Sequence, residues 1–417
     1  MARDKELYDE CDMFDTFFEY EIKDGVGIIP EWEIEIKEGA FEGCDELKCI
    51  DIPQWVTKIG KSAFSGCENL TEIVLPEWLE EIEEEAFFDC SCLEEISLPR
   101  WVKKIGDGAF QGCSSFTGIS IPPSVTEIGG GAFSFCSSLM SIVVSKENQV
   151  YDSREGCNAI IHTESNTLIC GCKNTIIPPS VTEIGNRAFE DCSNLKSISI
   201  PESVTMIGDW AFSYCSSLTS ISIPESVTMI GERAFDDCSS LTSISIPESV
   251  TEIGEEAFSG CSSLTSIVVS KDNKVYDSRE DCNAIIHTKS NTLIRGCKNS
   301  VIPPSVTEIG EDAFSGCSSL ASISIPPSVT KIGWGAFRDC TSLTSISIPP
   351  SVTEIGWSTF YGCSSLTSIS IPPSVTVIGD WAFSGCSSLT SISIPKGCQV
   401  ANDAFDGCPE NLVITRY

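Results

Sequence analysis

Histidine is scarce in this sequence, and the common nucleotide-binding motifs are missing. The only two histidines, His162 and His287, occupy the same place in two near-identical segments. A residue copied with its surroundings is more often structural or solvent-facing than catalytic, and no Ser-His-Asp arrangement is evident. The sequence also lacks a P-loop and a dinucleotide-binding fingerprint. These absences argue against an enzyme and against a bound cofactor.

Two further absences bear on where the chain acts. No apolar stretch reaches about 20 residues, so the sequence predicts no membrane-spanning helix. The opening residues, MARDKELYDECDMF, lack the basic and apolar regions of a secretion signal. The sequence by itself therefore favours a soluble, cytoplasmic protein.

Basic residues are few. The chain has 26 Lys and Arg against 60 Asp and Glu, a formal net charge of −34. Nucleic acids and anionic membrane surfaces both attract proteins through Lys and Arg. This charge balance therefore excludes nucleic acid and an anionic lipid surface as the main partner.

The dominant positive feature is an internal repeat of 23 residues. Phenylalanines recur at this step from Phe41 through Phe64 and onward, and fourteen of them stand at the same repeat position. A cysteine follows each of them by three residues, from Cys44 to Cys408, and prolines keep the same period. A period held this strictly predicts a solenoid in which one coil corresponds to one repeat.

One repeat can be divided into three pieces. The stretch LTSISIP alternates apolar and polar residues, which predicts a short strand with Leu218, Ile221 and Ile223 inward and Ser220 and Ser222 outward. The stretch VTMIG predicts a second short extended piece, and ERAFDDC predicts a helical or 3-10 turn that buries Phe and Cys. No coil can cover its own apolar face, so each depends on its neighbours.

These residues resemble the leucine-rich repeat family of the BspA-like (Treponema pallidum type) class. The motif Cys-x-x-Leu-x-x-Ile-x-Ile-Pro followed by Val-x-x-Ile-Gly-x-x-Ala-Phe runs from Cys215 to Phe235. The resemblance implies a horseshoe or arc with a parallel β-sheet on its concave face and short β or 3-10 segments on the other face. It also implies a protein that binds other proteins, in bacteria mostly at the cell surface or after secretion.

Counting strand ends predicts about 17 coils. Two of them are longer, at residues 145–178 and 270–303, and each contains two apolar runs around a Ser-Asn turn, as in AIIHTESNTLI. We interpret this pattern as a β-hairpin, with the following NTIIP as the next strand of the main sheet. The predicted organisation is an N-terminal cap at 1–25, a solenoid at 26–395 and a C-terminal capping coil at 396–417.

Cysteine is abundant, with 23 residues. Fourteen share one repeat position, which favours a ladder of buried, reduced thiols, because Cys packs well as a small hydrophobe. Disulfides between neighbouring coils are the alternative. Cys170 and Cys172 suggest zinc only weakly, because the second long coil has Arg295 and Cys297 there. The acids of the long coils fit solvated turns better than a calcium loop: Asp152, Glu155, Asp277, Glu280 and Asp281.

The first coils differ from the rest. Residues 1–121 contain 29 acidic and 10 basic residues, whereas the other 296 contain 31 and 16. A tryptophan stands two residues after the proline in four successive early coils, where most later coils have Ser. These rings either pack under the cap against Phe14, Phe17 and Phe18, or form an exposed stripe rimmed by acids. The candidate partner-binding residues are Trp32, Trp55, Trp78, Trp101, Asp51, Glu72, Glu94 and Glu95.

The sequence therefore predicts a non-enzymatic scaffold for protein–protein interaction, with a basic partner bound by the acidic, Trp-bearing coils. Later strands expose almost only Ser and Thr from Ser197 to Ser393, which favours a uniform spacer or a surface for weak multivalent contact. The alternative is an adhesin-like protein, secreted or held at the cell surface, that binds host or matrix proteins. No metal or cofactor is expected, and the sequence does not predict an oligomeric state.

Overall fold

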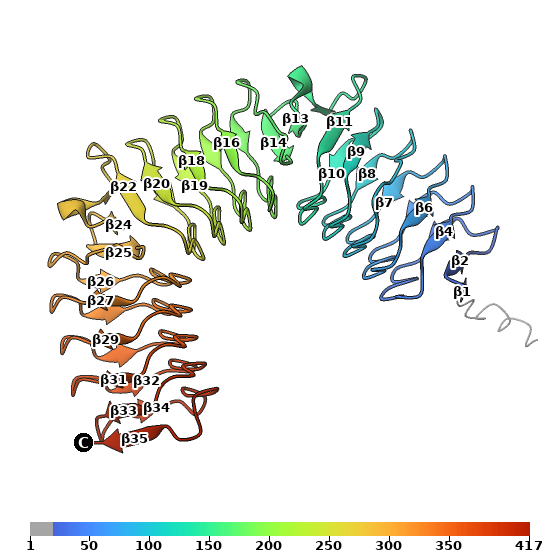
Figure 1. Ribbon diagram of the computed structural model, residues 1–417. Coiled ribbons are helices and arrows are strands. Elements are labelled where there is room, and N and C mark those ends of the chain that lie inside the picture. Colours follow the sequence, from blue (N-terminus) through green and yellow to red (C-terminus); the bar gives the residue numbers. More distant parts are fainter. Residues whose placement is uncertain (1–19) are drawn as a thin grey trace, which may run out of the picture.

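A computed structural model describes residues 20–417 and forms a single solenoid. About 17 coils stack along an arc, with the N-terminal coils at one end and the C-terminal coils at the other (Figure 1). The strands form parallel sheets along the stack, and no α-helix occurs within the described residues. The predicted repeat solenoid is therefore confirmed.

Most coils contribute one longer strand of three or four residues. Its outward positions are exposed and its inward positions are buried, as in Ser220–Ser222, where Ile221 is buried between two exposed serines. Neighbouring coils pair in parallel so that Ile198 lies beside Ile221. The longer strands are β2 Val26–Ile28, β4 Cys49–Asp51, β6 Glu72–Val74, β9 Gly118–Ile121, β11 Ser141–Val144, β16 Ser197–Ser199, β18 Ser220–Ser222, β20 Ser243–Ile246, β22 Ser266–Val269, β27 Ser322–Ser324, β29 Ser345–Ser347, β31 Ser368–Ser370, β33 Ser391–Ile394 and β35 Val413–Arg416.

Almost every coil also contributes a two-residue strand, at the second extended piece that the sequence predicts. These strands form ladders in which the same residue of each coil is paired, for example Ile207 with Ile230. They are β3 Glu35–Ile36, β5 Lys58–Ile59, β7 Glu81–Ile82, β8 Lys104–Ile105, β10 Glu127–Ile128, β15 Glu183–Ile184, β17 Met206–Ile207, β19 Met229–Ile230, β21 Glu252–Ile253, β26 Glu308–Ile309, β28 Lys331–Ile332, β30 Glu354–Ile355, β32 Val377–Ile378 and β34 Gln399–Val400.

Each long coil contains the predicted β-hairpin. In the first, β13 Ile160–His162 pairs antiparallel with β14 Thr167–Cys170, and β12 Tyr151–Asp152 adds a third strand. The second repeats this with β23 Tyr276–Asp277, β24 Ile285–His287 and β25 Thr292–Arg295. The only 3-10 helices of the described chain, η1 Arg154–Gly156 and η2 Arg279–Asp281, lie in these coils and are visible as the two short coiled ribbons in Figure 1.

The strand predicted at NTIIP is wrong. The segment contains no strand, and Ile176 is exposed while its N–H donates to the Cys157 carbonyl at 3.0 Å. The reason lies in the hairpin, because β14 pairs in parallel with β15 and joins the ladder of two-residue strands. The residues that follow connect back across the coil without pairing in the main sheet.

The segment that carries Ala and Phe is a chain of turns rather than one helical turn. Ala63 N–H donates to the Gly60 carbonyl and Cys67 N–H to the Phe64 carbonyl, which closes two separate turns. Ser62, inside the first of these turns, has a φ of 52°, in the left-handed region that interrupts a helix. The freed amides bond to the next coil instead, as when Phe64 N–H donates to the Ala86 carbonyl at 2.8 Å.

Phenylalanine rings form the centre of the core. Rings of successive coils are nearly parallel, with centroids 5.0–5.6 Å apart. Three stacks result, because each long coil lacks this phenylalanine. There Gly171 and Gly296 make room for the rings of Phe189 and Phe314, since an added Cβ would lie only 2.1 Å from the ring.

The cysteine ladder runs beside the ring stacks. Most of its thiols are buried, and Cys67 Sγ donates to the Phe41 carbonyl of the preceding coil at 3.0 Å, a contact that later coils repeat. No disulfide links the described cysteines. Burial raises the pKa of Cys67 to about 12, so the thiol form predominates at neutral pH.

The two ends are modified coils. At the N-terminus β1 Glu21–Lys23 pairs antiparallel with β2, and Tyr20 packs on Phe41 with ring centroids 5.2 Å apart. The predicted contacts of Phe14, Phe17 and Phe18 lie outside the described residues. At the C-terminus β35 completes the sheet, and Arg416 donates to the Cys398 carbonyl at 2.8 Å. The domain boundaries at 25 and 395 stay predictions.

Replacing a ring in the middle of a stack is expected to destabilise the protein strongly. Phe235→Ala removes a fully buried side chain that stacks on rings from both neighbouring coils. We expect a loss of about 3–5 kcal/mol in the free energy of unfolding, measured by chemical denaturation. Phe405→Ala is the matched control, because Phe405 is only half-buried and stacks on one ring. Equal losses for the two variants would contradict a central role for the stack.

Thiol reactivity is expected to separate the ladder from the one exposed described cysteine, Cys92. In a Cys11→Ser background, an aromatic disulfide reagent should modify Cys92 first, and Cys92→Ser should remove this fastest phase. The buried thiols should react only on unfolding, because they are inaccessible and mostly protonated. Rapid labelling of Cys215 in the folded protein, detected by mass spectrometry, would show that the thiols of the ladder are accessible to solvent and would contradict this prediction.

Candidate protein-binding surface

Trp32, Trp55 and Trp78 lie in the turns that follow β2, β4 and β6, and Trp101 lies in the equivalent turn of the next coil, which has none of the longer strands. Their exposed fractions are 63% for Trp32, 66% for Trp55, 49% for Trp78 and 40% for Trp101. The rings of Trp78 and Trp101 stack with centroids 6.0 Å apart, and the Arg100 guanidinium lies 5.2 Å from the Trp101 ring centroid. We call these four residues the tryptophan stripe. Large apolar rings at successive positions form the kind of surface that contacts another protein.

Later coils use the same position differently. In six of them a serine hydroxyl donates to a valine carbonyl of the preceding coil, as in Ser226 to Val204 at 2.6 Å and Ser249 to Val227 at 2.7 Å. The contact recurs at Ser124, Ser203, Ser351 and Ser374. Trp55, Trp78 and Trp101 have no hydroxyl with which to make this bond, and they expose a large ring instead. Coil stability alone does not explain this exchange.

Two of the four predicted acids lie in longer strands: Asp51 in β4 and Glu72 in β6, and both are exposed. Glu94 and Glu95 are exposed in the next coil, where Glu95 forms only an isolated bridge to Gly118. Glu72 and Glu95 occupy the same repeat position. Each of these acids precedes the tryptophan of its own coil by four to seven residues, so the acids and the tryptophans belong to the same three coils. Within residues 20–417, no ion pair involves Asp51, Glu72, Glu94 or Glu95.

Acids on the two-residue strands are arranged differently. That ladder alternates in charge from coil to coil, with Glu35, Lys58, Glu81, Lys104 and Glu127 paired in register. Opposite charges in adjacent strands attract, whereas like charges repel. Part of the acidic excess is therefore neutralised within the protein on this side. Asp51, Glu72, Glu94 and Glu95 have no such partner within residues 20–417.

Glu83 is the centre of this ion-pair network. Its carboxylate lies 3.1 Å from Lys58 Nζ and 3.1 Å from Lys104 Nζ, so it links three coils. Burial alone would raise its pKa, but hydrogen bonds and charge from Lys104 and Lys58 outweigh that effect and lower the pKa. The two ion pairs explain how a glutamate can replace the glycine that most coils have at this position.

Sequence reasoning missed a second group of exposed aromatic rings. Trp334, Trp357 and Trp381 have exposed fractions of 56%, 39% and 43%, and the last two have ring centroids 5.9 Å apart. Trp334 and Trp357 directly follow an Ile-Gly pair one repeat apart, so the period contains a signal for them. A fourth ring, Trp210, lies between the guanidinium groups of Arg187 and Arg233.

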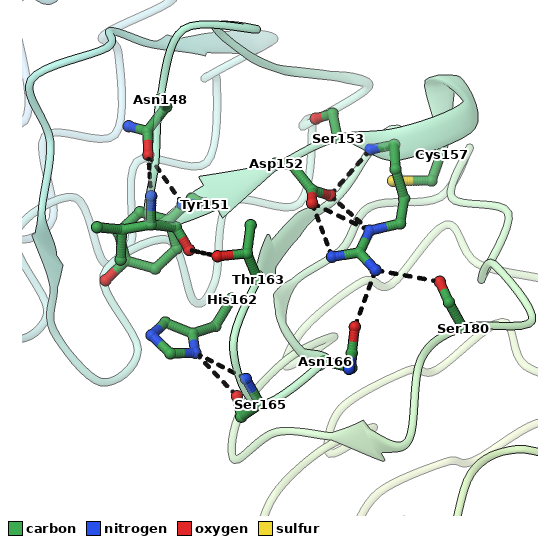
Figure 2. Close-up of polar contacts among 12 residues, drawn as sticks. Asn148, Tyr151, Asp152, Ser153, Cys157, His162, Thr163, Ser165, Asn166 and Ser180 are labelled. Carbon is green, nitrogen blue, oxygen red and sulfur yellow. Dashed lines mark hydrogen bonds and ion pairs between the residues drawn. The ribbon is translucent and has the colours of Figure 1, made fainter.

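The polar residues of the hairpins form internal contacts. Figure 2 shows the Asp152 carboxylate bound by Arg154, whose Nη1 also donates to Asn166 at 2.8 Å. His162 Nδ1 lies 2.9 Å from the Ser165 hydroxyl across the turn. The second hairpin repeats these contacts. Over residues 20–417, no group of three His, Cys, Asp or Glu side chains is placed to hold a metal ion.

The Glu83 network predicts a pH-dependent stability. The folded-state pKa of Glu83 is below its unfolded value, so its contribution is present above about pH 4.5 and is lost as the pH falls through the folded pKa. We expect Glu83→Gln to lower the free energy of unfolding at pH 7 by up to about 1 kcal/mol. In denaturation curves the difference from wild type should shrink below pH 4. Glu77→Gln, at an exposed turn, should show no such pH dependence.

Comparison with known proteins agrees with this architecture. The family model described as "BspA type Leucine rich repeat region" matches in six copies, at residues 34–155, 166–282 and 292–411. A leucine rich cell surface protein from Faecalibacterium prausnitzii is 31% identical, with a TM-score of 0.53 over 92% of this chain and 82% of that one. A leucine-rich repeat protein from Eubacterium ventriosum is 25% identical, with a TM-score of 0.51 over 85% and 81%. No curated protein matches the sequence.

The family establishes what kind of protein this is at a coarse level. Leucine-rich repeat proteins are generally protein-binding scaffolds and typically not enzymes. Across the described part of the chain, no helix is long and apolar enough to cross a lipid bilayer. The extent of the repeat match and its motifs lead to one conclusion: the chain belongs to the BspA type leucine-rich repeat family.

Proposed function

We propose that the chain is a scaffold that binds a basic segment of another protein along the tryptophan stripe and the acids beside it. The observation that carries this proposal is the exchange at one repeat position. Where six later coils have a serine that bonds to the preceding coil, Trp55, Trp78 and Trp101 present an exposed indole. At these three positions the exchange gives up the serine contact and adds exposed apolar surface, which is useful for binding and not for folding.

The chemistry of the surface favours a cationic partner. Indole rings attract ammonium and guanidinium groups through their π faces, and Arg100 already lies 5.2 Å from the Trp101 ring centroid. Tryptophan is also common among the residues that contribute most to binding energy at interfaces. Within residues 20–417, Asp51, Glu72, Glu94 and Glu95 have no ion pair, so they would increase the rate of encounter with a basic partner.

The spacing of the stripe suits an extended peptide. Side chains on one face of an extended strand recur at about 6.8 Å, twice the rise per residue. The rings of Trp78 and Trp101 are 6.0 Å apart. A peptide running along the stack with a basic residue at every second position would therefore place about one cation per coil.

An adhesin-like role outside the cell is the second candidate. It is favoured by the similarity to the Faecalibacterium prausnitzii protein, whose description places that protein at the cell surface. In such a role the serine-rich coils would act as a spacer and the stripe would contact host or matrix proteins. Fractionation of native cells decides between the two locations: recovery only from the cytosol would refute the adhesin.

The decisive variant replaces Trp32, Trp55, Trp78 and Trp101 with serine. The serines introduced at positions 55, 78 and 101 can make the inter-coil bond of the later coils, so we expect the variant to fold with a melting temperature close to that of wild type. Crosslinking pull-downs from the native source should lose the partners captured by the full wild-type chain. Binding of a synthetic peptide that alternates Lys with Ala, measured by titration calorimetry, should weaken by about tenfold or more.

Two controls complete this test. A triple Trp334→Ser, Trp357→Ser and Trp381→Ser variant removes exposed rings elsewhere and should keep the partners. Glu72→Lys with Glu95→Lys should mainly slow association and reduce its salt dependence. If the quadruple variant keeps every partner and only its melting changes, the stripe is a folding device and the proposal is wrong.

A further inference from the structure

The two long coils are near copies that differ at one inward position. The first has Cys170 where the second has Arg295. In both, the ladder of two-residue strands breaks just before the hairpin, because β10 and β21 end their sheets. A tyrosine hydroxyl caps each broken edge, where it accepts the N–H of Ile128 at 3.0 Å or of Ile253 at 3.1 Å. Each long coil therefore opens a wedge-shaped gap in the ladder of two-residue strands. We call the gap after β10 the first wedge and the gap after β21 the second wedge.

The first wedge is filled. Cys170 is buried and continues the thiol ladder between its neighbours on either side. The space that remains there is only about 20 Å³. With a small apolar side chain at this position, the wedge closes.

The second wedge stays open. Its volume is about 310 Å³, enough for one long side chain. The Arg295 side chain is 4% exposed, and its Nη1 and Nη2 donate to the carbonyls of Asp312 at 3.0 Å and Ser315 at 2.9 Å. Its Nε has no hydrogen-bond partner. Arg295 thus holds the next coil in place and leaves one buried donor at the wedge unsatisfied, which costs free energy unless an acceptor arrives.

The rest of the lining favours a cation with an apolar stem. Half-buried Ile253 and Ile294 supply apolar surface, and the rim carries five acids: Glu255, Glu256, Glu308, Glu311 and Asp312. Glu256 is paired with Arg233 and Glu308 with Lys331. No ion pair involves Glu255 or Glu311 within residues 20–417, and Asp312 Oδ1 is buried without a hydrogen-bond partner. Asp312 Oδ1 lies against Gly335 of the following coil and does not face the wedge. Glu255 and Glu311 are therefore the two charged rim groups that are available.

We propose that this wedge binds a lysine or arginine side chain from a segment of a partner protein. The aliphatic stem packs on Ile253 and Ile294, and the cationic head pairs with Glu311 and Glu255. A Lys or Arg side chain supplies both the apolar stem and the charge, which a free metal ion or a simple anion does not. The site is separate from the tryptophan stripe and does not depend on it.

The test uses the full-length chain and three capped tripeptides, with Arg, Lys or norleucine between two glycines. Norleucine has an aliphatic stem without a charge. Saturation-transfer NMR at physiological salt should detect the Arg and Lys peptides and not the norleucine peptide. Arg295→Cys should close the wedge as in the first long coil and abolish binding. Glu255→Gln, which removes one of the two rim charges, should weaken binding by about threefold.

Further variants keep the proposal falsifiable if Arg295→Cys fails to fold. Glu311→Gln changes an exposed rim residue and should weaken binding, whereas Glu225→Gln, an exposed acid on a distant turn, should not. The quadruple Trp→Ser variant should bind the tripeptides like wild type, which separates this site from the stripe. Equal binding of the norleucine peptide, or unchanged binding by Arg295→Cys or by Glu311→Gln, would overturn the proposal.

Discussion

Every coil of this protein is held by contacts with the equivalent residues of the neighbouring coils. Phenylalanine stacks on phenylalanine at about the spacing of paired strands, and the isoleucines of neighbouring coils lie side by side. A 23-residue period is therefore a physical requirement, because a ring displaced by one residue would lose its contacts with the rings of both neighbouring coils. Stability in such a stack is a sum of neighbouring interfaces. The termini and the long coils, where the stack is interrupted, are where the structure must use other contacts.

The same dependence makes each departure from the repeat informative. A position that repeats is determined by packing, so a residue that breaks the repeat without serving the packing needs another reason. Trp78 replaces a serine whose hydroxyl bonds to the coil before it, and Arg295 replaces a cysteine that fills the thiol ladder. Both substitutions leave something unsatisfied, an exposed ring in one case and a buried N–H in the other. Both surfaces also have acids around them that lack a cation.

Most of the fold could be predicted from the sequence because its signals are local and repeated. The alternation around Ile221 predicts a strand with one buried face, and the apolar runs around a Ser-Asn turn predict the hairpins. What could not be predicted depends on contacts between coils. The left-handed φ of Ser62 follows from amides that bond to the next coil, and the absence of a strand near Ile176 follows from β14 taking that pairing. The difference between Cys170 and Arg295 is visible in the sequence, but the volume that it opens is not.

The repeat also determines which charged residues lie next to each other, and that arrangement favours one region of the protein for a partner. Stacking places like residues close together, so an acid that repeats at one position repels its own copy. The ladder from Glu35 to Glu127 avoids this by alternating Glu with Lys. The row that contains Glu72 and Glu95 does not alternate, and neither acid has an ion pair. That repulsion remains in the free protein and would be relieved by a cation from outside. A basic partner would therefore supply along this row the charges that the protein supplies for itself on the ladder of two-residue strands.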